Sequence, residues 1–276
     1  MEYPRATWRL IQSPPAAGSW NMAVDEAILE AVASGASPTT LRLYAWAPPC
    51  LSLGYAQSIN DADRQRLAAR GWHLVRRPTG GRAILHTDEL TYSVIGSQDE
   101  PRLSGSVLES YQRLSQALLL ALHALGIPAQ AEPNPEGAGE NRLPAAVCFE
   151  VPSNYEITVH GRKIIGSAQA RRKGVVLQHG SFPLYGDLRR ITQVLTFADE
   201  NTRAQAAERL KSRATTAQEF LASPPTWEQA AQAFCLAFAQ ALNLELMPGT
   251  LSAEELELAR RLEVEKYANP SWTERV

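Results

Sequence analysis

The chain has 276 residues, of which 45% are hydrophobic and 20% charged, and its formal net charge is −2. This length suits one large domain, or one and a half, and the near-neutral charge gives no reason to expect nucleic acid as a partner. Because no run of 18 or more apolar residues occurs, we expect no membrane span, and the first residues lack the pattern of a secretory signal. These features predict a cytoplasmic globular enzyme.

The first half of the chain predicts helices and a set of short strands. Residues 19–33 place apolar side chains at helical spacing, with Asp25 and Glu26 in the first turns, where the helix dipole favours acidic groups. A polar helix is expected over 59–70, and a longer helix with a leucine stripe over 103–125. The strand-like runs of this half are residues 40–46, 50–55, 73–77, 83–86 and 90–95.

The second half predicts a meander followed by helices. Residues 126–147 are too rich in Pro, Gly and Asn for a regular element, and a loop this long in a compact domain is usually functional or disordered. Tight turns then join three strands in an antiparallel arrangement, residues 155–160, 163–168 and 175–182. The remaining helices are expected at 187–195, 203–221, 226–243 and 252–266. Strands first and helices last favour an α+β layer fold over an alternating parallel sheet.

Gly80 and Gly81 lie between two predicted strands, and two interpretations stay open. A Gly-Gly pair forms a two-residue hairpin turn readily, since both residues tolerate positive φ. Glycine also lets a backbone approach a ligand where a Cβ would clash. The neighbouring Arg76, Arg77 and Arg82 favour a ligand, because guanidinium groups bind phosphate or carboxylate groups and a turn needs none.

Cys148 follows the Gly/Pro-rich loop, and Lys163 comes fifteen residues later. Most free cysteines are small buried hydrophobic residues, but an ammonium beside a thiol lowers the thiol pKa and yields a nucleophile at neutral pH. Only four of the 27 basic residues are lysines. A lysine in a predicted strand therefore hints at a group that, unlike guanidinium, can lose its proton; a plain turn residue is the alternative. Cys50 and Cys235 are expected to pack in the core, and three dispersed cysteines predict neither disulfides nor a zinc cluster.

Two further segments are candidates for a site. His86 closes a predicted strand as a general base, a ligand-orienting donor or a structural residue, and no second histidine lies at metal-ligand spacing. Small residues such as Gly166–Ala168 weaken a strand unless something lies against them, and an extended acyl chain would fit. Arg171–Lys173 is typical of a solvated turn, although it could also steer an acidic protein partner.

Two stretches, RRPTGGRAILH (76–86) and HGRKIIGSAQARR (160–172), together resemble the biotin/lipoate protein ligase superfamily. There an Arg-Arg-x-x-Gly-Gly segment and a Lys-Ile-x-Gly-x-Ala strand line the acyl pocket. The resemblance covers residues 20–248, including MAVDEAIL and QHGSFPL, and implies a catalytic domain with a mixed, mostly antiparallel sheet flanked by helices. Residues 249–276 would form a helical tail. Within the superfamily, the cysteine in VCFEVPSNYEI and the chain length resemble the octanoyltransferases of the LipM type.

The resemblance implies an acyltransferase of protein lipoylation and lipoate biosynthesis. Cys148 would accept an octanoyl group from octanoyl-acyl carrier protein as a thioester, Lys163 would lower the pKa of the cysteine, and a lysine of a lipoyl domain such as the glycine-cleavage H protein would receive the group. The enzyme would be a monomer that needs no ATP, cofactor or metal and binds neither membrane nor nucleic acid. The residues expected to line the substrate pocket are Arg77, Gly80, Gly81, His86, Gly166 and Ala168.

Three alternatives remain open at this point. An ATP-dependent lipoate–protein ligase would need a phosphate-binding surface and magnesium but no nucleophilic cysteine. An octanoyl-H-protein amidotransferase also uses a cysteine and differs mainly in its donor. A carrier-binding module without activity would dock without a covalent intermediate, and the presence of both Cys148 and Lys163 counts against it.

Overall fold

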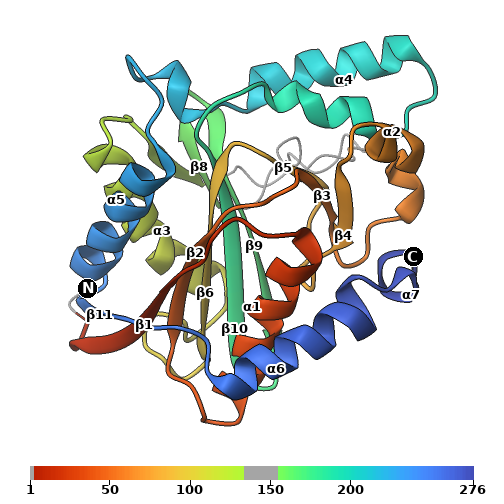
Figure 1. The fold of residues 1–276 in the computed structure, drawn as a ribbon. Helices are drawn as coiled ribbons and strands as arrows, with labels where there is room; N and C mark the ends of the chain where they lie inside the picture. The colour runs from red at the N-terminus through yellow and green to blue at the C-terminus, as the bar shows by residue number, and fades with distance from the viewer. Residues whose placement is uncertain (1–2, 134–154) are drawn as a thin grey trace.

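The computed structural model describes residues 3–133 and 155–276, and it has a large mixed sheet at its centre (Figure 1). The strand order is β11-β1-β2-β6-β10-β9-β8-β7. Most neighbouring strands are antiparallel, while β1 pairs in parallel with both β2 and β11. The bounds are β1 Ala6–Gln12, β2 Thr40–Tyr44, β6 Glu89–Ser97, β7 Gln130–Pro133, β8 Tyr155–Val159, β9 Arg162–Arg172, β10 Val175–Pro183 and β11 Leu244–Pro248.

Helices cover both faces of this sheet, which confirms the expected α+β layer fold. On one face, α3 (Val107–Ala124) and α5 (Trp227–Ala241) pack against each other and bury leucine and phenylalanine side chains on the strands. On the other, α1 (Gly18–Ala33) and α6 (Ala253–Leu262) form a smaller apolar cluster with β1, β6 and β10. Capping boxes at Ser106, Thr226 and Ser252 fix where α3, α5 and α6 begin.

The predicted antiparallel meander is present. His160 and Gly161 turn β8 into β9, and Lys173 and Gly174 turn β9 into β10, all four with positive φ as a two-residue type I′ hairpin requires. One expectation was wrong: β7 lies inside the segment expected to be irregular and pairs antiparallel with β8. Of the helix expected over 203–221, the chain forms α4 (Glu200–Arg213) and then a short 3₁₀ turn at Ala217–Glu219.

A second, three-stranded sheet contradicts the hairpin interpretation of Gly80 and Gly81, one of the two that the sequence left open. Its order is β4-β3-β5, with bounds β3 Cys50–Leu53, β4 His73–Arg76 and β5 Ile84–His86. The strands on either side of the two glycines therefore do not pair with each other, because β3 lies between them, parallel to β4 and antiparallel to β5. The short helix α2 (Arg64–Ala69) connects β3 to β4.

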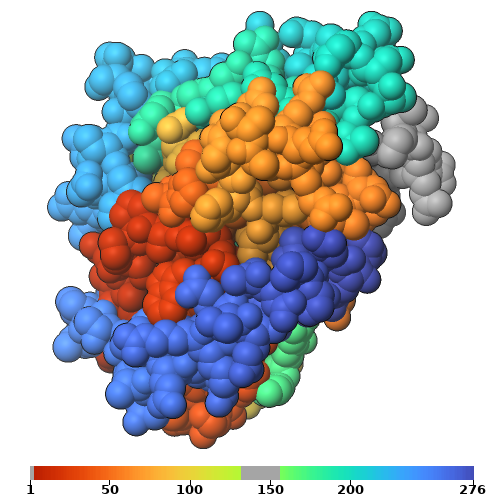
Figure 2. Space-filling view, turned by 45° about the vertical axis from the view of Figure 1, so that its right-hand side comes forward, coloured from red at the N-terminus to blue at the C-terminus, as the bar shows by residue number. Residues whose placement is uncertain are grey.

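The C-terminal segment packs against both α1 and the small sheet. In Figure 2 it runs across one face of the molecule, beside the N-terminal residues and the segment that carries β3 and β4. Its last helix, α7 (Pro270–Thr273), is held by Arg76, whose buried guanidinium donates to the carbonyl oxygens of Thr273, Gly54 and Gln57. The tail thus anchors the start of the RRPTGG segment. Among the described residues, no helix is long and apolar enough to cross a membrane.

Gly54 is expected to tolerate no side chain. A Cβ built on Gly54 would lie 1.9 Å from the carbonyl oxygen of Gly81, a backbone atom that cannot move away alone. We expect Gly54→Ala to lower the free energy of unfolding by about 1–3 kcal/mol, the usual cost of overpacking. Thermal and denaturant unfolding measure this, with Gly80→Ala as the control, because a Cβ at Gly80 meets nothing within 4 Å. Equal stability of the two variants would contradict the prediction.

Candidate functional site

A cavity lies between the large sheet, the small sheet and the start of α1. Arg77, His86, Gly166 and Ala168, four of the residues expected from the sequence, lie in its wall. Gly80 and Gly81 belong to the adjacent loop and are not among the lining residues. The rest of the wall was missed by sequence reasoning and consists of Met22, Tyr44, Trp46, Ser52, Ile84, Thr91, His179, Gly180 and Ser181.

Strand register explains why small residues of β9 face this cavity. Gly166 pairs with Ser181 and Ala168 with His179, so these four side-chain positions share one face of the sheet. Ser167 points to the other face, where its hydroxyl lies 2.8 Å from that of Tyr92. The sequence predicted that the small residues of β9 would make space for a ligand on one face of the strand. Gly166 and Ala168 do line the cavity, where larger side chains would occupy part of it.

Lys163 reaches the same face because of a register shift. Simple alternation would put residue 163 on the side of Ile165, opposite to Gly166. In the structure Thr158 pairs with Lys163, whereas Ile157 pairs with Ile165, so β9 holds one extra residue, Ile164, between the two pairs. Ile164 and Ile165 both enter the hydrophobic core. This bulge moves Lys163 to the cavity side of the sheet.

Lys163 is 5% exposed, and its ammonium nitrogen lies 2.9 Å from a carboxylate oxygen of Glu156. Glu156 is on β8, two residues before Thr158, and therefore on the same face as Lys163. Sequence reasoning missed Glu156. The backbone of Lys163 is also fixed, because its carbonyl accepts a hydrogen bond from Thr215 N–H at 3.0 Å.

Arg77 closes its own loop rather than pointing into open solvent. Its guanidinium donates to the carbonyls of Gly80 and Arg82 at 2.9 and 2.7 Å, and to the Ser52 hydroxyl at 3.1 Å. Gly81 has φ +93°, and a Cβ there would lie 2.9 Å from the same guanidinium. Gly81 is thus required by close packing of the chain on itself.

His86 belongs to a buried hydrogen-bond network centred on Glu89. Its Nδ1 lies 2.7 Å from Glu89, its Nε2 lies 2.8 Å from the Ser52 hydroxyl, and its ring stacks on Trp46 at 3.8 Å. Thr91 and Ser181 also donate to Glu89. Burial alone would raise the pKa of Glu89, but the His86 ring and the donated hydrogen bonds outweigh it, so the pKa lies below its usual range. The side chains of His86, Ser52, Thr91 and Ser181 in the cavity wall are thus held in place by this network around Glu89.

Asp25 organises a second buried network beneath the cavity. The sequence predicted Asp25 in the first turns of a helix, where the dipole favours an acidic group, but α1 begins seven residues earlier, at Gly18, and Asp25 is fully buried against the sheet. Arg42 lies 2.7 Å away, and Tyr44 and Ser93 donate to the carboxylate. Burial raises the pKa of Asp25, yet Arg42 and His179 together hold it below the ordinary value.

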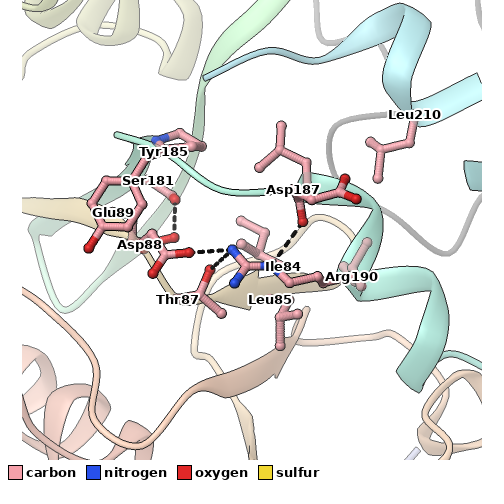
Figure 3. Close-up of a pocket in the computed structure, with 13 residues that line it drawn as sticks. Ile84, Leu85, Thr87, Asp88, Glu89, Ser181, Tyr185, Asp187, Arg190 and Leu210 are labelled. Carbon is pink, nitrogen blue, oxygen red and sulfur yellow. Dashed lines mark hydrogen bonds and ion pairs between the residues drawn. The ribbon is translucent and has the colours of Figure 1, made fainter. Parts of the chain in front are cut away.

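A second pocket borders the first and is shown in Figure 3. Ile84 and Ser181 line both pockets, while Glu89 lines the second and its partners His86, Thr91 and Ser181 line the first. The Glu89 network therefore lies between the two pockets. In the second pocket Arg190 points toward Asp88 and Thr87 and donates to both (Figure 3). The charged side chains that line the second pocket are therefore paired with other protein groups: Arg190 with Asp88, Asp187 with Arg189, and Glu89 with His86.

Two of the three cysteines, Cys50 and Cys235, lie among the residues that the structure describes. Cys50 is buried, as predicted, and burial raises the pKa of its thiol far above the ordinary value. Cys235 on α5 is half-buried among apolar neighbours, and burial raises the pKa of its thiol as well. Cys148 lies outside the described residues.

Comparison with known proteins identifies the family. Residues 17–239 match the lipoyl protein ligase A/B catalytic domain. The chain is 43% identical to the octanoyltransferase LipM of Kyrpidia tusciae, over 98% of this chain and 99% of that protein, and 42% identical to that of Lysinibacillus sphaericus, over 96% and 98%. A bipartite lipoate protein ligase from Thermoplasma acidophilum superposes with a TM-score of 0.81 at 25% identity, covering 98% of this chain and 96% of that one. An ATP-bound lipoate-protein ligase A gives 0.78 at 25% identity, covering 97% and 98%. The chain therefore belongs to the lipoyl protein ligase A/B catalytic domain family and, within it, to the LipM octanoyltransferases of lipoate biosynthesis.

Proposed function

We propose that the chain, acting as a cytoplasmic monomer without ATP or a metal, transfers octanoyl from octanoyl-acyl carrier protein to a lysine of a lipoyl domain through a thioester on Cys148. Lys163 lowers the pKa of the Cys148 thiol. The observation that carries this proposal is the buried Lys163 ammonium on the cavity face of β9, the strand whose Gly166 and Ala168 line the cavity. The octanoyl group is suggested by the LipM relatives, and the acceptor by the Thermoplasma ligase, which was studied with its E2 lipoyl domain.

The reaction balances as two exchanges at one carbonyl carbon. The Cys148 thiolate attacks the donor thioester; a carbon–sulfur bond to the enzyme forms and the bond to the carrier breaks, and the carrier sulfur takes a proton. The acceptor amine then attacks the acyl-enzyme, a carbon–nitrogen bond forms, the Cys148 thiolate leaves, and the nitrogen releases one proton, which replaces the proton taken by the carrier sulfur. One thioester replaces another before the amide forms, so the route is ping-pong and needs no nucleotide.

The two described cysteines support this assignment of the nucleophile. A thiol acts as a nucleophile only as its thiolate, and burial disfavours the thiolate. The pKa values of Cys50 and Cys235 are both raised by burial. Neither is therefore suited to accept an acyl group at neutral pH, and Cys148 is the remaining thiol of the chain.

Intact-protein mass spectrometry after mixing with octanoyl-acyl carrier protein, without ATP, tests the proposal. We expect a hydroxylamine-labile gain of one octanoyl group in the wild type and in Cys235→Ala, and no gain in Cys148→Ala. A Cys148→Ala protein that still transfers the group would overturn the thioester route. Lipoylation of an acceptor only when lipoate and ATP are added would instead identify an ATP-dependent ligase like the ATP-bound fold neighbour.

A further inference from the structure

Glu156 is a part of the site that the two-residue scheme of cysteine and lysine does not use. It lies on β8 beside β9 (Figure 1), and its carboxylate is 2.9 Å from the Lys163 ammonium. The bulge at Ile164 brings these two side chains to one face of the sheet. Without that bulge Lys163 would point into the core beside Ile165, and the pair would not form.

The pair is more buried than a surface ion pair. The side chains of Lys163 and Glu156 are 6% and 17% exposed. One residue earlier on β9, Arg162 pairs with Glu219, and these side chains are 28% and 41% exposed. An ammonium withdrawn from water is costly unless a counter-charge accompanies it. The Glu156 carboxylate therefore supplies that counter-charge and holds Lys163 in place.

We propose that Glu156 is a positioning residue that acts through Lys163 in the second half-reaction, the attack of the acceptor amine on the acyl-enzyme. This inference rests on the thioester route proposed above. In the first half-reaction, the Lys163 ammonium gives its proton to the departing carrier thiolate and becomes an amine. In the second, the acceptor amine forms its bond to the acyl carbon, Cys148 leaves as thiolate, and the proton shed by nitrogen moves to the Lys163 amine, which becomes ammonium again.

The carboxylate affects these two proton transfers in opposite directions. A negative charge beside Lys163 favours proton uptake, which the second half-reaction needs, and opposes proton release, which the first half-reaction needs. Loss of that charge therefore slows transfer to the acceptor and spares acylation of the enzyme. A residue with a merely structural role would slow both steps together, because both use the same cavity and the same lysine.

The experiment measures the two half-reactions separately with Glu156→Gln, which keeps the shape of the side chain and removes its charge. Acylation is followed by intact mass after mixing with octanoyl-acyl carrier protein, and transfer by adding a lipoyl-domain acceptor to isolated acyl-enzyme. We expect acylation within about threefold of wild type and transfer slowed about tenfold or more. Glu156→Asp, which restores the charge, should recover part of the transfer rate, and Glu219→Gln, at the neighbouring exposed pair, should change neither step.

The other possible results contradict either the inference about Glu156 or the thioester route on which it rests. Equal slowing of both half-reactions assigns Glu156 a structural role, and no slowing of either removes it from the mechanism; both contradict the inference. If Glu156→Gln does not fold, Glu156→Asp decides alone, since it should slow transfer more than acylation. A wild-type enzyme that forms no acyl-enzyme contradicts the thioester route itself, a result that the same mass measurement separates from failure of the inference.

Discussion

Asp25→Ala is expected to lower the free energy of unfolding by about 3–5 kcal/mol, the cost of removing one partner of a buried ion pair. Asp25 and Arg42 are both fully buried, 2.7 Å apart, and the substitution leaves the Arg42 guanidinium without a carboxylate. Denaturant unfolding of the purified protein measures the change. Combining the substitution with Arg42→Met should recover part of the loss, because the uncompensated charge is then gone.

Glu30→Ala on the same helix is the matched control. Glu30 pairs with Lys173 at the surface, and such pairs contribute about 0–1 kcal/mol. An Asp25→Ala variant no less stable than Glu30→Ala would show that the buried pair does not stabilise the fold.

The pH dependence of the unfolding free energy is a second test of the contribution of Asp25 to stability. Because the folded pKa of Asp25 is lowered, its contribution is present above the unfolded value of about 3.9 and is lost as pH falls through the folded pKa. The difference in unfolding free energy between wild type and Asp25→Asn should therefore shrink below about pH 4. A difference that stays constant into the acid range would contradict this assignment.

Asp25 also shows where sequence reasoning fails. An acidic residue near a helix start is normally explained by the dipole, and nothing within α1 indicates burial. The informative residue lies elsewhere: Arg42 stands in the middle of the apolar strand β2, where a charge requires a partner. Local patterns predicted most of the helices and strands, although not β1, β7 or β11. A pair between α1 and β2 depends on how the helix lies across the sheet.

Strand order was the other property that local patterns could not supply. The turns at His160–Gly161 and Lys173–Gly174 were predicted correctly because each joins strands that are neighbours in both sequence and space. At Gly80–Gly81 the same logic failed, since β3 separates β4 from β5. The parallel strands β1 and β11 were missed because their pairing joins the two ends of the chain; β1 also lies before the expected 20–248 range.

The candidate site was predicted in part for a similar reason. Arg77, His86, Gly166 and Ala168 come from stretches whose motifs are visible in the sequence, and they line one cavity. Trp46 and His179 were not singled out, because an aromatic residue just after a strand and a histidine within one have many ordinary roles. The side of the sheet on which Lys163 lies depends on a bulge, and strand alternation alone predicts the wrong face.

Lys163→Ala is expected to reduce turnover by about 10²–10⁴-fold, the usual effect of losing a positioned proton-transfer group. If Lys163 supplies only positive charge, Lys163→Arg should restore activity. If it also exchanges protons, Lys163→Arg should remain inactive, because guanidinium does not lose its proton in proteins. The proposed route requires both roles, so turnover should be low in both variants.

A thiol-alkylation assay separates the two roles within the same pair of variants. The rate at which iodoacetamide modifies Cys148 at neutral pH reports its thiolate fraction. We expect fast alkylation in wild type and Lys163→Arg, in which residue 163 keeps its positive charge, and slow alkylation in Lys163→Ala. Equally fast alkylation in all three proteins would show that Lys163 does not activate Cys148. An active Lys163→Arg enzyme would show that Lys163 supplies only a positive charge. It would then contradict the proton-transfer role on which the inference about Glu156 depends.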